Sequence, residues 1–402
     1  MTKLLHTADW HLGKHLKRFD LAAEQHEALE RLLAVVDDEQ PDLVVVAGDV
    51  FDSGERPPLS ALREWTWVTQ EIVRRRPGGL PLVVIPGNHD HAERIAFNAH
   101  LTRASGLYLL NDLARAHEPL RIAGLELFGL PFHKPARVRA LRHDADPDGA
   151  LPDIGDFDYD AAMRWLAGRA LGASRGDLPR VAIVHAFVEG AGDEGEAEDP
   201  LMVGGAGAVR PGSLGGFDYV ALGHLHTPRP LPRQPHVRYA GSLYPYAFDE
   251  PGDKSVTIVS WDDGAEVGTR PEVRTVPLEV ARKVRTISDL PFDEVIRGGV
   301  AARAAGDPGV DDYLLVSVSD RAPIPHAQAR LSEVYPQALF EQRRLDVTPD
   351  ETLDLPDPSR HGVDEVFLAF YRHVLGADGE PSEVELELLR EALQRTSEEA
   401  SA

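Results

Sequence analysis

Five predicted strands end in side chains that can bind a metal ion, and this feature constrains the fold most. Each strand is a short apolar run that stops at a turn signal. The strand ends carry Asp9 and His11, Gly48–Asp49, Gly87–Asn88, His185, and the pair His224 and His226. Because open α/β sheets hold ligands beyond the carboxyl ends of their strands, we expect these side chains to converge.

Strand, turn and helix alternate through the first two thirds of the chain, which predicts a layered α/β domain. Strands are expected at Lys3–His6, Leu43–Ala47, Leu82–Ile85, Leu125–Leu130, Val181–Val184, Tyr219–Leu222, Val237–Ala240 and Val256–Trp261. Helices are expected over about Leu21–Glu39, Ser60–Arg75 and Ala161–Leu171. Surface loops are expected at residues 143–158, rich in Pro, Gly and Asp, and at the acidic residues 190–200.

The pattern changes near residue 270, which predicts a domain at residues 1–270 and a smaller α/β domain at residues 271–347. The smaller domain would hold strands at Val273–Ile287, Tyr313–Val318 and Ala338–Arg344 and helices at Phe292–Ala304 and His326–Tyr335. A Pro- and Asp-rich linker at residues 348–359 would lead to helices within residues 360–402. One of these has an apolar face from Val363 to Leu375, and Ser382 with Glu385 forms a capping-box pattern that opens the next, to about Arg395.

Composition narrows the classes of function. The net charge of −24 argues against a surface that binds nucleic acid throughout, and it leaves room for a local site. The clusters Arg74–Arg76 and Arg137–Arg142 are typical of solvated helix faces. The absence of cysteine excludes disulfides and thiolate metal sites. No apolar run approaches the roughly 20 residues that cross a bilayer and no signal peptide is visible, so a cytoplasmic, membrane-free protein is expected.

Carboxylate, imidazole and amide groups suit Mn²⁺, Fe or Zn²⁺. The set exceeds the needs of one ion, so we expect two ions that share a bridging carboxylate, Asp49. One ion would be bound by Asp9, His11 and His226, and the other by Asn88, His185 and His224. Each motif alone has an ordinary interpretation, such as a buried histidine, a helix cap or a turn. Together these polar groups would be costly at buried strand ends without a ligand, which favours the metal site.

The motifs D-x-H, G-D, G-N-H-D, H and G-H-x-H occur here in the order of the calcineurin-like metallophosphoesterase superfamily, which the chain resembles over residues 1–265. The resemblance implies a β-sandwich flanked by helices. A water held between two cations loses a proton easily and can attack phosphorus. By resemblance, His89 is the general acid for the leaving oxygen and binds no metal, while Asp90 orients His89.

Finer features point to one group within the superfamily. The second motif, Gly48–Asp52, is not followed by the Asp-Arg-Gly of protein phosphatases, and Asp90 stands where those enzymes carry Glu. With residues 6–13 and 239–250, the motifs resemble the SbcD family, the nuclease subunits of bacterial SbcCD complexes. This resemblance implies Mn²⁺, 3′→5′ exonuclease action on DNA duplex ends, endonuclease action on single strands and hairpins, and a homodimer. It also implies a heterotetramer with SbcC, a coiled-coil ATPase that the C-terminal helices bind.

Two other functions stay open at this point. A small-molecule or cyclic-nucleotide phosphodiesterase would use the same metal site with an unrelated C-terminal extension. A non-catalytic binding module would require a lost metal ligand, and the sequence retains every one.

Overall fold

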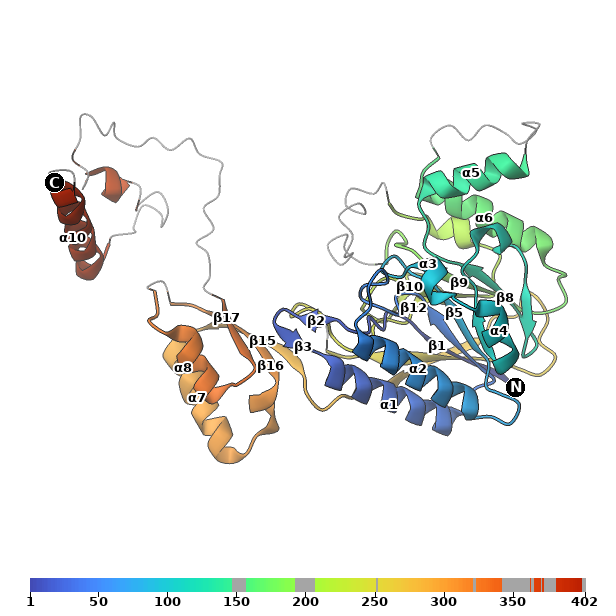
Figure 1. Ribbon diagram of the computed structural model, residues 1–402, viewed down its shortest axis with the longest axis horizontal. Helices are drawn as coiled ribbons and strands as arrows, with labels where there is room; N and C mark the ends of the chain where they lie inside the picture. Colours follow the sequence, from blue (N-terminus) through green and yellow to red (C-terminus); the bar gives the residue numbers. More distant parts are fainter. Residues whose placement is uncertain are drawn as a thin grey trace.

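A computed structural model of the chain describes residues 1–146, 157–191, 207–250, 252–320, 323–341, 362, 365–369, 371 and 381–399. Two six-stranded sheets face each other, and helices cover their outer faces. Figure 1 shows α1 and α2 on one side of this sandwich and α5 and α6 on the other. The expected layered α/β architecture is therefore confirmed.

The first sheet has the strand order β14-β13-β1-β4-β5-β6. Its strands are β1 (Thr2–Thr7), β4 (Leu43–Ala47), β5 (Leu82–Ile85), β6 (Leu107–Leu109), β13 (Ser255–Trp261) and β14 (Glu272–Pro277). The strands β1, β4, β5 and β6 run parallel, with Leu5 opposite Val44 and Val44 opposite Leu82. The antiparallel strands β13 and β14 complete the other edge. Parallel pairing places the carboxyl ends of β1, β4 and β5 at one edge of the sheet.

The second sheet has the order β11-β12-β10-β9-β8-β7. Its strands are β7 (Leu120–Ile122), β8 (Leu125–Leu130), β9 (Arg180–His185), β10 (Tyr219–Gly223), β11 (Arg229–Leu231) and β12 (Gln234–Tyr239). The central strands β8, β9, β10 and β12 are parallel, and Gly223 lies opposite His185. The second sheet thus also gathers several strand ends at one edge.

Alternation along the strands builds three apolar layers. In β4, Val45 faces the second sheet, whereas Val44 and Val46 face α1 (Ala22–Glu39) and α2 (Leu59–Arg74). On the far side, α5 (Pro135–Ala145) and α6 (Tyr159–Ala173) pack on the second sheet. The helix α5 contains Arg137–Arg142, which were expected on a solvated helix face, and it extends to Ala145, past the start of the loop expected from residue 143. Residues 147–156 of that loop lie outside the described residues.

Short elements complete this part of the chain. They are the hairpin strands β2 (His15–Leu16) and β3 (Phe19–Asp20), α3 (Ala92–Ile95), α4 (Ala99–Thr102), and the 3₁₀ turns Arg103–Ser105, Leu113–Arg115 and Pro211–Leu214. Most of the acidic segment at residues 190–200 lies outside the described residues.

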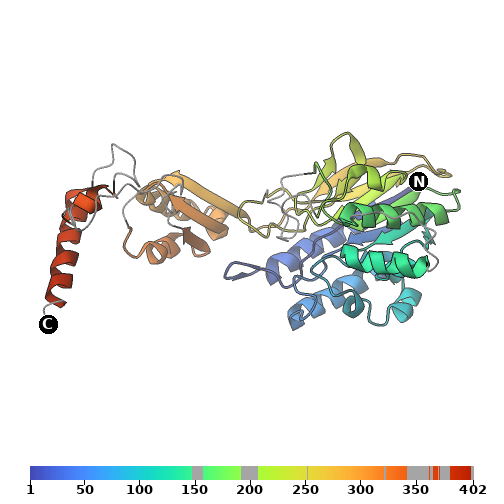
Figure 2. The same cartoon turned by 90° about the horizontal axis from the view of Figure 1, so that it is seen from above.

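The smaller domain lies to one side of the sandwich (Figures 1 and 2). It contains β15 (Val284–Leu290), α7 (Phe292–Ala305), a 3₁₀ turn (Pro308–Asp311), β16 (Tyr313–Val318), α8 (Ala327–Val334) and β17 (Ala338–Glu341). Its three parallel strands have the order β15-β16-β17. The predicted boundary at residue 270 falls too early, because β14 pairs with β13 and belongs to the first sheet. The small sheet begins only at Val284.

An aromatic cluster joins the two domains. The hairpin residue Phe19 packs 4.8 Å from Tyr313 of β16, measured between ring centroids. The Tyr244 hydroxyl donates to the Arg282 carbonyl at 2.8 Å. Leu16, Tyr246 and Val284 are buried in the same cluster, which connects the hairpin, the loop after β12 and the small domain.

The C-terminal helix α10 (Glu383–Glu399) begins where the capping box predicts. The Ser382 hydroxyl donates to Glu385 Oε2 at 2.7 Å, and the Glu385 amide donates to Ser382 Oγ at 3.3 Å. Residues 365–369 and 371 are helical, whereas Val363, Phe370, Val374 and Leu375 of the predicted apolar face lie outside the described residues, as does the linker at 348–359. Among the described residues, no helix combines the length and apolar character needed to span a bilayer.

Candidate metal centre

All the side chains predicted as metal ligands lie together at the carboxyl ends of parallel strands. Asp9 and His11 follow β1, Asp49 follows β4, Asn88 follows β5, His185 ends β9, and His224 and His226 follow β10. The first three strands belong to one sheet and the last two to the other, so the candidate centre bridges both layers of the sandwich.

The backbone at these positions is strained. Asp9, His11 and Asp49 have φ values of 52°, 42° and 51°, and His224 has φ 111°. Non-glycine residues seldom adopt such angles, which concentrate at functional sites. Hydrogen bonds hold two of these turns, from the Asp9 amide to the Gly48 carbonyl at 3.0 Å and from the His11 amide to the Asp49 carbonyl at 2.9 Å.

Two glycines allow the close approach of the ligands. A Cβ at Gly48, which has φ 94°, would lie 2.2 Å from His185 Nδ1. A Cβ at Gly87 would lie 2.1 Å from Asp49 Oδ1. Any larger residue would therefore displace a predicted ligand, which gives the glycines of both motifs a direct steric role.

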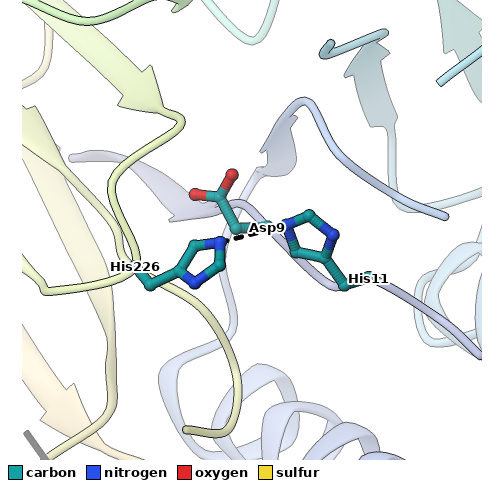
Figure 3. Close-up of side chains that lie close together, drawn as sticks. All are labelled: Asp9, His11 and His226. Carbon is teal, nitrogen blue, oxygen red and sulfur yellow. Dashed lines mark hydrogen bonds between the residues drawn. The ribbon is translucent and has the colours of Figure 1, made fainter. Parts of the chain in front are cut away.

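The first cluster is formed by Asp9, His11 and His226 (Figure 3). All are buried, and one ligand atom from each lies within 4.8 Å of the others. The Nε2 atoms of His11 and His226 are 3.1 Å apart. The His226 Nδ1–H donates to Glu250 Oε1 at 3.0 Å, so the Nε2 atom of the neutral ring is an available electron-pair donor. This cluster matches the group expected to bind the first ion.

The second cluster gathers around Asn88. Its Oδ1 atom lies 2.8 Å from His185 Nε2 and 3.1 Å from His224 Nδ1. The Ala47 carbonyl accepts from His185 Nδ1–H at 2.8 Å, which leaves Nε2 directed at the site. Asp49 lies between the clusters, because its Oδ2 atom is 3.4 Å from His185 Nε2 and 3.5 Å from His11 Nε2.

The electrostatics of the site fit a divalent cation. Burial raises the pKa of Asp9 to about 7 against the opposing charges of His185 and His226. Burial would also raise the pKa of Asp49, but His185 and His11 outweigh it and hold that pKa low. Burial disfavours the His185 cation, yet Asp49 raises the pKa of His185 to about 9. Within the described residues, the ion-pair partners of Asp9 and Asp49 are all histidines, so metal cations would supply the missing positive charge.

His89 lies at the edge of the centre. Its ring is 4.7 Å from the His11 ring, and its Nδ1–H donates to the Asp52 carbonyl at 2.9 Å. Its amide donates to Asp49 Oδ1 at 2.9 Å. The ring is thus oriented by the backbone of the Asp49 loop, which leaves Nε2 as the atom that can carry a transferable proton.

Asp90 makes different contacts from the expected ones. Its carboxylate accepts hydrogen bonds from the amides of Gly87, Val50 and Phe51 at 3.0–3.1 Å. Burial and the Asp49 charge raise the pKa of Asp90 to about 6. The expectation that Asp90 orients the His89 ring therefore needs correction. Asp90 joins the two ligand-bearing loops, and the Asp52 carbonyl holds the ring.

Two groups near the ligands were not predicted from the sequence. The Asp52 carboxylate lies 3.6 Å from His11 Nδ1 and 2.9 Å from Lys14 Nζ. Glu250 contacts His226. Burial alone would raise the pKa of Glu250, but the contacts with His226 and Lys254 lower it to about 2. Asp52 follows Gly48–Asp49 in a recognisable motif, whereas no spacing rule identifies Glu250.

Comparisons with known proteins identify the family of the chain. The family model for calcineurin-like phosphoesterase matches residues 2–228. The model for the type 5 capsule protein repressor C-terminal domain, of the SbcD C-terminal class, matches residues 280–374. The SbcD subunit of the nuclease SbcCD from Bacillus subtilis (strain 168) is 37% identical over 273 residues, which are 66% of this chain and 67% of the relative.

Similar solved structures are more distant in sequence. A dimetal phosphatase from Danio rerio matches with 13% identity and a TM-score of 0.41, covering 68% of this chain and 98% of that one. A hypothetical protein from Thermus thermophilus matches with 15% identity and a TM-score of 0.33, covering 69% and 99%. On the family models and the sequence relative, the chain is a metal-dependent phosphodiesterase of the calcineurin-like phosphoesterases and belongs to their SbcD family of nuclease subunits.

Proposed function

We propose that this nuclease subunit cleaves DNA at a two-metal centre, as a 3′→5′ exonuclease on duplex ends and an endonuclease on single strands and hairpins. The observation that carries the proposal is the convergence of two ligand clusters on Asp49 in a chain of the SbcD family. Mn²⁺ is the proposed metal, since nitrogen and oxygen ligands suit it. DNA repair and recombination in the cytoplasm are the proposed setting.

The residues divide the chemistry between them. When bound, the two cations supply an activated nucleophile and neutralise charge on the phosphoryl oxygens. Asp9, His11 and His226 would hold one ion, Asn88, His185 and His224 the other, and Asp49 both. His89 would donate a proton from Nε2 to the leaving oxygen while its Nδ1–H stays on the Asp52 carbonyl.

A helix with exposed cationic residues, α5, is connected to the centre and favours a long polyanion as the substrate. The Phe132 amide donates to the Pro86 carbonyl at 3.2 Å, and the Phe132 ring lies 6.4 Å from that of His185. Two residues later, Lys134 opens α5, and both Lys134 and Arg137 are exposed. On this acidic chain many arginines face carboxylates, as Arg121 faces Asp177 at 2.6 Å. Within the described residues neither Lys134 nor Arg137 has an ion pair, so both are suited to phosphates.

The experiment compares DNA with a small diester. With Mn²⁺, the protein and its ATPase partner should cut a blunt duplex and a DNA hairpin as well as bis(p-nitrophenyl) phosphate. Lys134→Glu/Arg137→Glu should weaken DNA cleavage at least ~10-fold, lower the salt slope of binding by about one per lost phosphate contact, and spare the small diester. Arg175→Glu, on an exposed residue before β9 at the other end of the sheet, is the control. Activity on the small diester alone would instead support a small-molecule or cyclic-nucleotide phosphodiesterase.

We also propose that the C-terminal helices bind an SbcC-type coiled-coil ATPase. Tyr371 of the preceding helical segment donates to Glu385 of α10 at 2.9 Å, which connects the two segments. Val384 and Leu388, one turn apart on α10, are exposed large apolar side chains. Such a stripe fits a groove on a partner.

A homodimer through the nuclease domain is the remaining partner proposal. Leu59 and Leu62 of α2 and Phe97 and Leu101 around α4 are exposed, Phe97 by 76%. These connections follow the neighbouring parallel strands β4 and β5, so they lie next to each other on one face of the first sheet. We propose that these exposed apolar side chains contribute to the surface that binds a second copy.

Introducing charge into this surface should separate the copies. Leu59→Asp/Phe97→Asp is expected to reduce the mass measured by light scattering to the 44.0 kDa of one chain. Val300→Asp, on an exposed apolar residue of α7, should leave the mass of the dimer unchanged. A dimer that survives the double substitution would place the interface elsewhere.

A further inference from the structure

Glu250 and Lys254 hold His226 at two points. Glu250 Oε1 accepts from His226 Nδ1–H at 3.0 Å, and Glu250 Oε2 accepts from Lys254 Nζ at 2.8 Å. Lys254 Nζ also donates to the His226 carbonyl at 2.9 Å. The three residues therefore form a closed ring of contacts that fixes both the backbone and the imidazole of His226.

The two charged side chains that contact His226 are largely buried. The Lys254 side chain is 1% exposed and the Glu250 side chain is 13% exposed. Lysine is almost never fully buried unless it is paired, and a buried charge costs free energy unless its partners satisfy it. Here the lysine neutralises the carboxylate that contacts the histidine, which allows a charged glutamate to remain behind the centre.

The histidines of the two clusters donate their Nδ1–H groups to different kinds of acceptor. His226 donates its Nδ1–H to a carboxylate, whereas His185 donates its Nδ1–H to the neutral Ala47 carbonyl. A carboxylate partner fixes the tautomer and makes the opposite ring nitrogen a stronger electron-pair donor. The His226 Nε2 atom faces His11 Nε2 at 3.1 Å, inside the Asp9 cluster.

We propose that Glu250, supported by Lys254, is a positioning residue that selectively strengthens the ion site formed by Asp9, His11 and His226. The proposal rests on the two-metal centre proposed above and adds an asymmetry between its sites. The ion held by this cluster would bind more tightly than it would without Glu250, and the ion of the Asn88 cluster would be insensitive to Glu250.

The test is a Mn²⁺ titration of the full chain by calorimetry, without DNA. The wild type should bind two ions, and Glu250→Gln should weaken one site by about 10–100-fold and leave the other unchanged. Asp249→Asn, which changes the exposed neighbouring carboxylate, should behave as the wild type. Melting of the metal-free proteins provides the check on folding. If Glu250→Gln leaves Lys254 unpaired and unfolds the chain, Glu250→Gln/Lys254→Met removes both charges and should show the same selective loss.

Two unchanged sites in a folded Glu250 variant would overturn the proposal, as would equal weakening of both. Weakening in Asp249→Asn would overturn it too, because the effect would then not be specific to the contact with His226. A wild type that binds fewer than two ions would refute the two-metal centre itself, and this proposal with it. Because the readout is metal binding, failure of DNA cleavage would not affect the outcome.

Discussion

Asp49→Ala is expected to abolish the binding of both divalent cations and to reduce phosphodiester hydrolysis by more than about 10³-fold. The Asp49 carboxylate lies between the two clusters, 3.4 Å from His185 Nε2 and 3.5 Å from His11 Nε2. Loss of one preorganised group that serves a single charge already costs ~10²–10³ in rate, and Asp49 would serve two. Metal content after dialysis against Mn²⁺ and hydrolysis of bis(p-nitrophenyl) phosphate measure the two effects.

The control for this variant is Glu55→Ala. Glu55 is an exposed carboxylate on the same connection between β4 and α2, so the substitution removes an equal charge nearby. It should retain both ions and full activity. An Asp49→Ala protein that still bound two ions would show that the clusters do not share this carboxylate.

Much of the fold follows from local sequence. The bounds of β4, β5, β8 and β16 agree with those expected, because each is a short apolar run between clear turn signals. The meeting of the ligands also follows, since parallel strands place consecutive strand ends at one edge. The position of Asp49 close to both His11 and His185 is therefore predictable from the sequence, and its role as a shared ligand stays a prediction.

Features that depend on distant contacts could not be inferred. The hairpin β2–β3 has two residues in each strand and packs against Tyr313 in the other domain. The strand β14 has only half-buried and exposed residues, so its place in the first sheet depends on pairing with β13. The bounds of α5 could not be inferred either, because Val138 is its only buried residue and no apolar period marks where the helix begins and ends.

The candidate site also combines residues that local sequence predicts with contacts that depend on distant parts of the chain. Asp90 belongs to a motif, yet its contacts with the amides of Val50 and Phe51 come from the folding of another loop. Glu250 meets His226 across a loop without a characteristic spacing. Ligands that follow strands are predictable from sequence, whereas the groups that orient them are fixed by tertiary packing.

His89→Leu is expected to retain both ions and to lose nearly all DNA cleavage, by about 10²–10⁴-fold. The His89 ring is held by the Asp52 carbonyl and lies outside both predicted ligand groups. Its loss removes a proton donor and leaves the ligands of each ion in place. Mn²⁺ titration and hairpin cleavage by the variant check the two halves of this result, and His91→Leu, two residues along the loop, is the matched control.

The leaving group separates a general acid from a residue that only shapes the site. A nucleoside oxygen needs a proton as it departs, whereas p-nitrophenolate is stable without one, so His89→Leu should affect bis(p-nitrophenyl) phosphate far less than DNA. A structural role would slow both substrates alike, and loss of an ion would do the same. Equal losses on the two substrates, or a reduced Mn²⁺ content, would therefore remove His89 from the proton-transfer step and make it a ligand or a packing residue.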